Sequence, residues 1–133
     1  MNDVNVKSKA TTGYQTHIQI RQHQVVADEP LDLGGQDSAP TPMEYVSAAL
    51  ASCTSITLQM YANRKGWTWE AIEVEVNQVD NRFLRKITIT GLVTEEQQKR
   101  ILQIANACPV HKILTGTQNV ETLFEHYGNS TNE

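Results

Sequence analysis

Residues 41–66 read TPMEYVSAALASCTSITLQMYANRKG and form the longest stretch of the chain with a single helical pattern. Thr41 fits a helix N-cap, Pro42 the first helical position and Glu44 the third, which together make a capping box with the favoured proline inside it. Gly66 supplies the C-terminal stop. The pattern predicts one helix over residues 42–65, which is roughly 36 Å long at about 1.5 Å per residue.

This helix has no charged residue from Tyr45 to Asn63, about the length that spans a bilayer. Polar residues are nevertheless spread round it, and they are Ser47, Ser52, Thr54, Ser55, Thr57, Gln59 and Asn63. That distribution favours a helix buried in protein over a membrane helix. A chain of 133 residues has little material to cover such a helix on most sides, so we expect a symmetric partner.

Alternating polar and apolar residues predict strands on both sides of the long helix. The segments are residues 17–21, 25–26, 72–76 and 84–93. The first two make a hairpin around Gln22 and His23, and the last two make a hairpin that turns at Asp80 to Arg82. Between the first hairpin and the helix, DEPLDLGGQDSAPTP (Asp28 to Pro42) is a loop of unusual length. Gly34 and Gly35 are explained there by a turn, or by a loop that lines a site.

A second capping box, Thr94 to Gln97, opens another helix. Its predicted buried stripe consists of Ile101, Leu102, Ile104 and Ala105. Pro109 cannot continue that helix, because it lacks the amide donor and crowds the preceding turn. Cys108 therefore becomes the N-cap of a short helix that ends near Gly116. Residues 119–124 are predicted to form a last short strand, and residues 126–133 a frayed tail.

Length and composition indicate one domain over residues 1–133, with a core at about residues 13–124 and flexible termini. Hydrophobic residues make up 39% and charged residues 20%, which argues against disorder. The net charge is −4 and no Lys/Arg stripe is present, which argues against a nucleic-acid partner. The first residues show no apolar leader, so we expect a cytoplasmic protein.

The stretch CPVHKIL (Cys108 to Leu114) contains the first chemically interesting group. A thiol at a helix N-terminus faces unpaired backbone amides, which favour the reactive thiolate. His111, three residues on, could donate to that thiolate or accept its proton. The alternative is that Cys108 is a small buried hydrophobic residue and His111 a surface residue.

Cys53 lies in the middle of the long helix, where no helix terminus can activate it. By itself it is explained as a core cysteine. A reactive thiolate at this position would need a cation from elsewhere, and Arg21 is the only arginine before the long helix. Glu44 is already explained by the capping box, and nine steps of about 100° place it on the opposite side of the helix from Cys53.

Two cysteines in a reducing compartment are more often free thiols or a transient redox pair than a permanent disulfide. The sequence leaves open whether Cys53 and Cys108 lie within the roughly 7 Å between Cα atoms that a disulfide needs. A metal site with Cys53, Cys108 and His111 is the other alternative, but it lacks a fourth ligand.

Two segments together carry a resemblance to a known family. ADEPLDLGGQDSAPTPMEYVSAALASCTSITLQMYANRKGW (Ala27 to Trp67) and ANACPVHKIL (Ala105 to Leu114) resemble the OsmC/Ohr family, the osmotically induced and organic-hydroperoxide-resistance proteins. Both cysteines fall where that family keeps its pair. The resemblance implies an α+β fold in which antiparallel sheets wrap round long central helices in an intertwined homodimer.

The resemblance also implies a function. Cys53 would attack the O–O bond of an organic hydroperoxide, and Cys108 would then condense with the resulting sulfenic acid to a disulfide. A dithiol reductant, carried by lipoyl groups in the Ohr branch, would restore the pair, and no metal or flavin cofactor is required. Arg21, Glu44 and His111 are the supporting candidates.

One position departs from the Ohr branch. That branch has an activating glutamate directly after the helix-opening proline, where this chain has Met43, and the acid is shifted to Glu44. The chain is therefore closer to the general OsmC-like branch. Two alternatives stay open: a thiol–disulfide exchange or sulfur-handling protein, and a non-enzymatic dimer that binds a small molecule.

Overall fold

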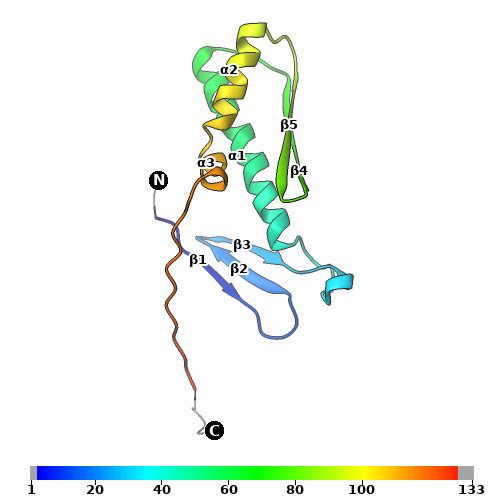
Figure 1. The fold of residues 1–133 in the computed structure, drawn as a ribbon, viewed down its shortest axis with the longest axis vertical. Helices are drawn as coiled ribbons and strands as arrows, with labels where there is room; N and C mark the ends of the chain where they lie inside the picture. The colour runs from blue at the N-terminus through cyan, green and yellow to red at the C-terminus, as the bar shows by residue number, and fades with distance from the viewer. Residues whose placement is uncertain (1–2, 129–133) are drawn as a thin grey trace.

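A long central helix organises the computed structural model, which describes residues 3–128. Helix α1 (Pro42–Lys65) crosses the molecule, with the β4–β5 hairpin along one side and α2 near its C-terminal end (Figure 1). In chain order the elements are β1 (Val6–Lys9), β2 (Thr16–Ile20), β3 (His23–Ala27), the 3-10 turn η1 (Leu31–Leu33), α1, β4 (Ala71–Val79), β5 (Arg82–Thr90), α2 (Glu95–Asn106) and α3 (Pro109–Thr115).

The bounds of α1 agree with the prediction. Thr41 accepts a hydrogen bond from the Glu44 main-chain N–H at 3.1 Å, and the Glu44 carboxylate accepts from the Thr41 N–H at 2.8 Å. Gly66 closes the helix in the left-handed conformation at φ 73°. The second capping box, between Thr94 and Gln97, likewise opens α2.

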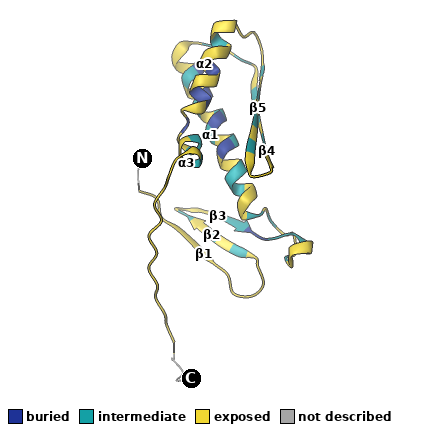
Figure 2. Ribbon diagram, viewed as in Figure 1, coloured by how far each residue is buried: buried dark blue, intermediate teal, exposed yellow. Residues whose placement is uncertain are grey.

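Helix α1 buries only one row of side chains, spaced four residues apart: Leu50, Thr54, Leu58 and Ala62. Leu58 joins Ile101 and Ile104 of α2 in the buried core cluster. Strand β4 packs along α1, and the Gln78 amide donates to Ser47 Oγ and to the Met43 carbonyl. Buried residues are concentrated on this part of the helix and on α2 (Figure 2).

Both predicted hairpins are present and antiparallel. Strand β4 pairs with β5 from Ala71 opposite Thr90 to Val79 opposite Arg82. Asp80 and Asn81 turn that hairpin with φ of 51° and 65°, a conformation that Asp and Asn tolerate better than other side chains. Strands β2 and β3 form the other hairpin, and β1 adds a third strand at its edge.

The structure corrects three expectations. Residues 119–124 form no strand, because no described segment pairs with them, and Val120, Leu123 and Phe124 are almost fully exposed. Strand β1 was not expected, since Val-Lys-Ser-Lys has neither apolar alternation nor a buried residue. Leu102, expected in the buried stripe of α2, is 55% exposed, because its side chain is rotated by about 100° round the helix from that of Ile101. Of the predicted tail at 126–133, residues 129–133 lie outside the described residues.

The long loop before α1 is closed on itself by hydrogen bonds. Asp28 is buried, and its carboxylate accepts from the main-chain N–H groups of Glu29, Gln36 and Ser38 and from the Ser38 hydroxyl. The Ser38 hydroxyl, followed by the Glu29 N–H, holds the pKa of Asp28 below its ordinary value. The loop is thus an ordered structure that fixes where β3 leads into α1.

Gly35 tests how tightly this loop is packed. A Cβ on Gly35 would overlap the main-chain carbonyl of Glu29, whereas a Cβ on Gly66 would meet open space and suffer only from its left-handed φ. We expect Gly35→Ala to lower the free energy of unfolding by about 2 kcal/mol or more, the scale of overpacking. Gly66→Ala should cost about 1 kcal/mol. Urea denaturation of both variants measures which of them loses more unfolding free energy. Equal losses would mean that the loop can accommodate a methyl group at position 35.

Asp28 gives a pH-dependent prediction. Because its folded pKa lies below the ordinary value, the charged carboxylate contributes stability above about pH 4, and that stability is lost as the pH falls through the folded pKa. Asp28→Asn should therefore be less stable than the wild type at pH 7, and the difference should shrink below about pH 4. Urea denaturation at a series of pH values measures this. A difference that stays constant down to pH 2 would contradict it.

Candidate functional site

Cys108 lies at the break between α2 and α3, as predicted. It is the N-cap of α3, with φ −65° and ψ 143°, and its Sγ accepts a hydrogen bond from the His111 main-chain N–H at 3.3 Å. Its side chain is fully buried. The thiol therefore combines two features that the sequence offered as alternatives: it is a packed residue, and it accepts a hydrogen bond from a main-chain amide in the first turn of a helix.

Cys53 lies near the middle of α1 and is partly exposed. The described contact of its Sγ is with Thr57 Oγ1 at 4.0 Å. Ile56 and Met60 follow it at three and seven residues, so these three side chains share one face of the helix. Ile56 and Met60 are 51% and 59% exposed. Cys53 thus lies toward the face that a single chain leaves open.

Thr54 connects the two cysteines. It is fully buried in the row that α1 turns toward the core. Its Oγ1 lies 3.9 Å from Cys108 Sγ, and it is the residue that directly follows Cys53. Cys108 therefore packs against the turn of α1 that carries Cys53. Both cysteines are free thiols in this structure.

Arg85 of β5 is the polar residue of this region that sequence reasoning missed. Its Nη1 donates to Thr54 Oγ1 at 3.0 Å and to the Ala105 carbonyl at 3.2 Å. Its Nη2 donates to Asn106 Oδ1 and lies 3.1 Å from His111 Nδ1. The signal was present in the strand alternation: β5 turns Phe83, Ile87 and Ile89 inward, and Arg85 occupies the charged position in that inward row.

His111 is close to Cys108 but meets it through the main chain. A guanidinium can only donate, so His111 Nδ1 must accept from Arg85, and the ring is neutral with its proton on Nε2. Burial, and secondarily the Arg85 charge, lowers the pKa of His111. The imidazole is therefore directed to Arg85, and the group that stabilises Cys108 is the His111 N–H.

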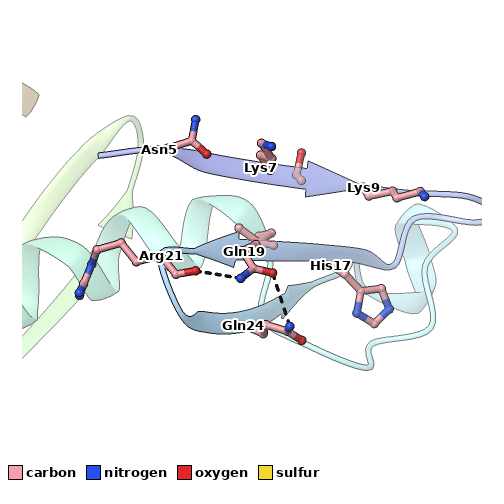
Figure 3. Close-up of a pocket in the computed structure, with 9 residues that line it drawn as sticks. Asn5, Lys7, Lys9, His17, Gln19, Arg21 and Gln24 are labelled. Carbon is pink, nitrogen blue, oxygen red and sulfur yellow. Dashed lines mark hydrogen bonds between the residues drawn. The ribbon is translucent and has the colours of Figure 1, made fainter. Parts of the chain in front are cut away.

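Arg21 and Glu44 have their described hydrogen bonds elsewhere. Arg21 is in the β2–β3 turn, where its Nη1 donates to Gln22 Oε1 at 3.3 Å. In Figure 3 it extends from the end of the N-terminal sheet, beside an open hollow of about 710 Å³ that Gln19 and Gln24 also line. Glu44 is occupied by its capping box. Among the described residues, neither has a hydrogen bond to Cys53 or Cys108.

A small cavity opens beside Arg85 and His111. Its volume is about 340 Å³, and its apolar walls include Leu50, Phe83 and Leu114. Within residues 3–128, no three His, Cys, Asp or Glu side chains are grouped so that they could hold a metal ion, so the metal alternative has no support in this part of the chain. In the same residues, no helix is both long enough and apolar enough to cross a bilayer.

Known proteins similar to this chain share its fold. A candidate osmotic stress induced and detoxification response protein from Psychrobacter arcticus is 23% identical, with a TM-score of 0.74 over 85% of this chain and 89% of that one. An OsmC like protein from Mycoplasma pneumoniae is 20% identical, with a TM-score of 0.69 over 86% and 89%. An organic hydroperoxide resistance protein OsmC from Legionella pneumophila is 20% identical, with a TM-score of 0.62 over 87% and 91%.

The TM-scores show a likeness of fold at low sequence identity, and they confirm the expected α+β class with antiparallel sheets and a long central helix. No curated protein matches the chain. A family model described as OsmC-like protein matches residues 35–123, which include all of α1 and both cysteines. A match over more than half of the chain shows the family: this chain belongs to the OsmC-like proteins.

Proposed function

We propose that the chain is a cysteine-based peroxidase that reduces organic hydroperoxides to alcohols with Cys53 and Cys108. The observation that carries the proposal is the contact of Cys108 Sγ with Thr54 Oγ1 at 3.9 Å, because Thr54 is the neighbour of Cys53 on α1. Cys108, 55 positions after Cys53 in the chain, thus packs against the turn of α1 that carries Cys53, and this supports the proposed pairing. A redox pair needs that proximity, whereas two independent packing cysteines do not.

The different burial of the two cysteines supports their proposed roles. Cys53 is partly exposed, so a peroxide can reach its sulfur from solvent or from an interface. Cys108 is fully buried and cannot be the first to meet a bulky hydroperoxide. Cys53 is therefore the attacking thiol and Cys108 the resolving thiol.

The reaction takes three balanced steps. The Cys53 thiolate attacks the terminal oxygen of ROOH, the O–O bond breaks, and the departing alkoxide takes a proton to give ROH and Cys53 sulfenic acid. The Cys108 thiol then displaces the hydroxyl, which leaves as water with the thiol proton, and an S–S bond forms. A dithiol reductant, such as a lipoyl group, exchanges with that disulfide and returns both cysteines to thiols. No metal or flavin takes part, and the reducing cytoplasm supplies the reductant.

We also propose a homodimer as the working form. Large apolar side chains are exposed on α1, on α2 and in the C-terminal segment, and they include Met43, Ile56, Met60, Leu102, Val120, Leu123 and Phe124. A helix that has no charge from Tyr45 to Asn63 and buries only one row of side chains requires cover on its other faces. A second copy supplies identical apolar surfaces, and Cys53 would then lie at the edge of the interface.

A second function has one observation in its favour. Met43 stands where the Ohr branch places its activating glutamate, and Glu44 is held in the capping box on the opposite side of α1 from Cys53. A weakly activated Cys53 would react slowly with peroxide, yet could still form a disulfide with Cys108. The chain would then serve general thiol–disulfide exchange or sulfur handling.

Substitution of the cysteines separates these functions. The reduced wild type should consume cumene hydroperoxide and form the Cys53–Cys108 disulfide in stopped-flow and mass-spectrometric assays. Cys53→Ser should be slower by about 10³-fold or more, as is typical when a nucleophile is removed. Cys108→Ser should still react once and leave a sulfenic acid on Cys53 that dimedone traps.

Three other outcomes would contradict the peroxidase proposal. If Cys53→Ser consumes peroxide as fast as the wild type, the peroxidase proposal is wrong. A very slow wild-type reaction together with a readily formed disulfide would support the thiol–disulfide function. If iodoacetamide alkylates neither thiol at neutral pH until the protein is unfolded, the cysteines are packing residues and both redox functions fail.

The dimer is tested on the exposed face of α1. Met60→Asp puts a charge on a surface that the second copy would bury, and we expect it to convert the dimer to monomer in sedimentation velocity at micromolar concentration. Leu92→Asp is the matched control, since Leu92 is 94% exposed but lies in the loop after β5. A wild-type protein that sediments as a monomer would contradict the proposal directly.

A further inference from the structure

Arg85 is a half-buried charge whose described hydrogen-bond partners are all neutral. They are the Thr54 hydroxyl, the Ala105 carbonyl, the Asn106 amide oxygen and the neutral His111 ring. A charge taken out of water is costly unless its new contacts compensate for that loss. A leucine at this inward strand position would continue the apolar row of β5. The retained arginine therefore points to a role beyond packing.

The four acceptors come from three helices that meet around Cys108. Thr54 belongs to α1, Ala105 and Asn106 to the last turn of α2, and His111 to α3. The last turn of α2 has no basic residue of its own, so Arg85 provides the cation and donors that a helix C-terminus favours. One guanidinium from β5 thus joins the elements on both sides of the break at Cys108.

The proton positions at Thr54 show how this arrangement affects the thiol. Thr54 Oγ1 lies 2.7 Å from the Leu50 carbonyl, so the hydroxyl proton is directed there. Its lone pairs then face the Arg85 N–H at 3.0 Å and Cys108 Sγ at 3.9 Å. Toward Cys108, Thr54 can act only as an acceptor. The Cys108 S–H is consequently directed toward the residue next to Cys53.

The hydrogen bonds of the Arg85 guanidinium argue against an anion-binding site at this residue. A guanidinium has five N–H groups, and the four on Nη1 and Nη2 already have protein acceptors. A substrate carboxylate could form the bidentate contact that arginine prefers only by breaking some of these bonds. Arg85 therefore serves the protein's own groups.

We propose that Arg85 is the positioning residue of the resolving step: it holds Cys108 against the Thr54 turn of α1, in reach of Cys53. The inference rests on the proposed redox pair. In that step the Cys108 sulfur forms the S–S bond, and the hydroxyl of the Cys53 sulfenic acid leaves with the thiol proton as water. The competing reaction is a second hydroperoxide oxidising the sulfenic acid to sulfinic acid, with release of another alcohol.

The kinetic experiment measures the two oxidation steps separately in Arg85→Gln, Arg85→Lys and the matched control Lys86→Gln. Lys86 carries the same charge on the same strand but on its outer, exposed face. In Arg85→Gln the peroxide-dependent first step should stay close to wild type. Disulfide formation should slow by about tenfold or more, as expected when hydrogen bonds from a charged donor are lost. Sulfinic acid on Cys53 should increase accordingly.

The conservative variants distinguish positioning from simple loss of fold. Arg85→Lys keeps the charge without the planar fork and should fall between Arg85→Gln and wild type. Thr54→Val removes the shared acceptor at nearly constant volume and should slow disulfide formation as Arg85→Gln does, while Thr54→Ser should not. Equal slowing of both oxidation steps, or slowing in Lys86→Gln as well, would overturn the positioning role.

A second measurement needs no peroxide. Equilibration with reduced and oxidised glutathione gives the effective concentration of the Cys53–Cys108 pair, which should fall by about tenfold or more in Arg85→Gln. An unchanged value overturns the inference. If that value falls but the wild type does not react with hydroperoxide, the peroxidase function fails while the positioning role stands. A wild-type pair that never forms a disulfide overturns both.

Discussion

The row of buried side chains along α1 is the constraint on which the rest of the structure depends. Leu58 anchors the apolar core against α2, and Thr54, four residues earlier, meets both Cys108 and Arg85. The helix therefore places the hydrophobic core and the polar cluster on one face, one turn apart. The position of Cys53 follows from this: as the residue before Thr54 it must lie about 100° away, toward the open side.

Local rules account for most of the fold that could be predicted from the sequence. The two capping boxes and Pro109 define where helices begin through interactions between residues that are close in the sequence. For this reason α1 and the start of α3 were predicted correctly. Strand pairing is not local. Val6–Lys9 forms a strand only because β2 offers an edge, and residues 119–124 form none because no described strand pairs with them.

The candidate site was harder to predict than the fold. The cysteines stand out by residue type, and the family resemblance linked them, but no local pattern shows that Thr54 lies against Cys108. Arg85 sits 31 residues from Thr54 in the chain, and its importance depends on the β4–β5 hairpin packing on α1. A charged residue in the inward row of an alternating strand is the one sequence signal that could have drawn attention to it.

In the proposed redox cycle, the unequal burial of the two thiols would also constrain how the pair is reset. If the proposed Cys53–Cys108 disulfide forms, the sulfur of Cys53 would be the one on the more exposed side of α1, and a dithiol reductant would attack there. Cys108 would then depart as a thiolate, at the position where the His111 N–H donates to its sulfur at 3.3 Å. A leaving thiolate that is already hydrogen-bonded departs more easily. In the proposed cycle, the helix break at Pro109 would thus assist the reduction of the disulfide, because it supplies the amide that would stabilise the charge on Cys108.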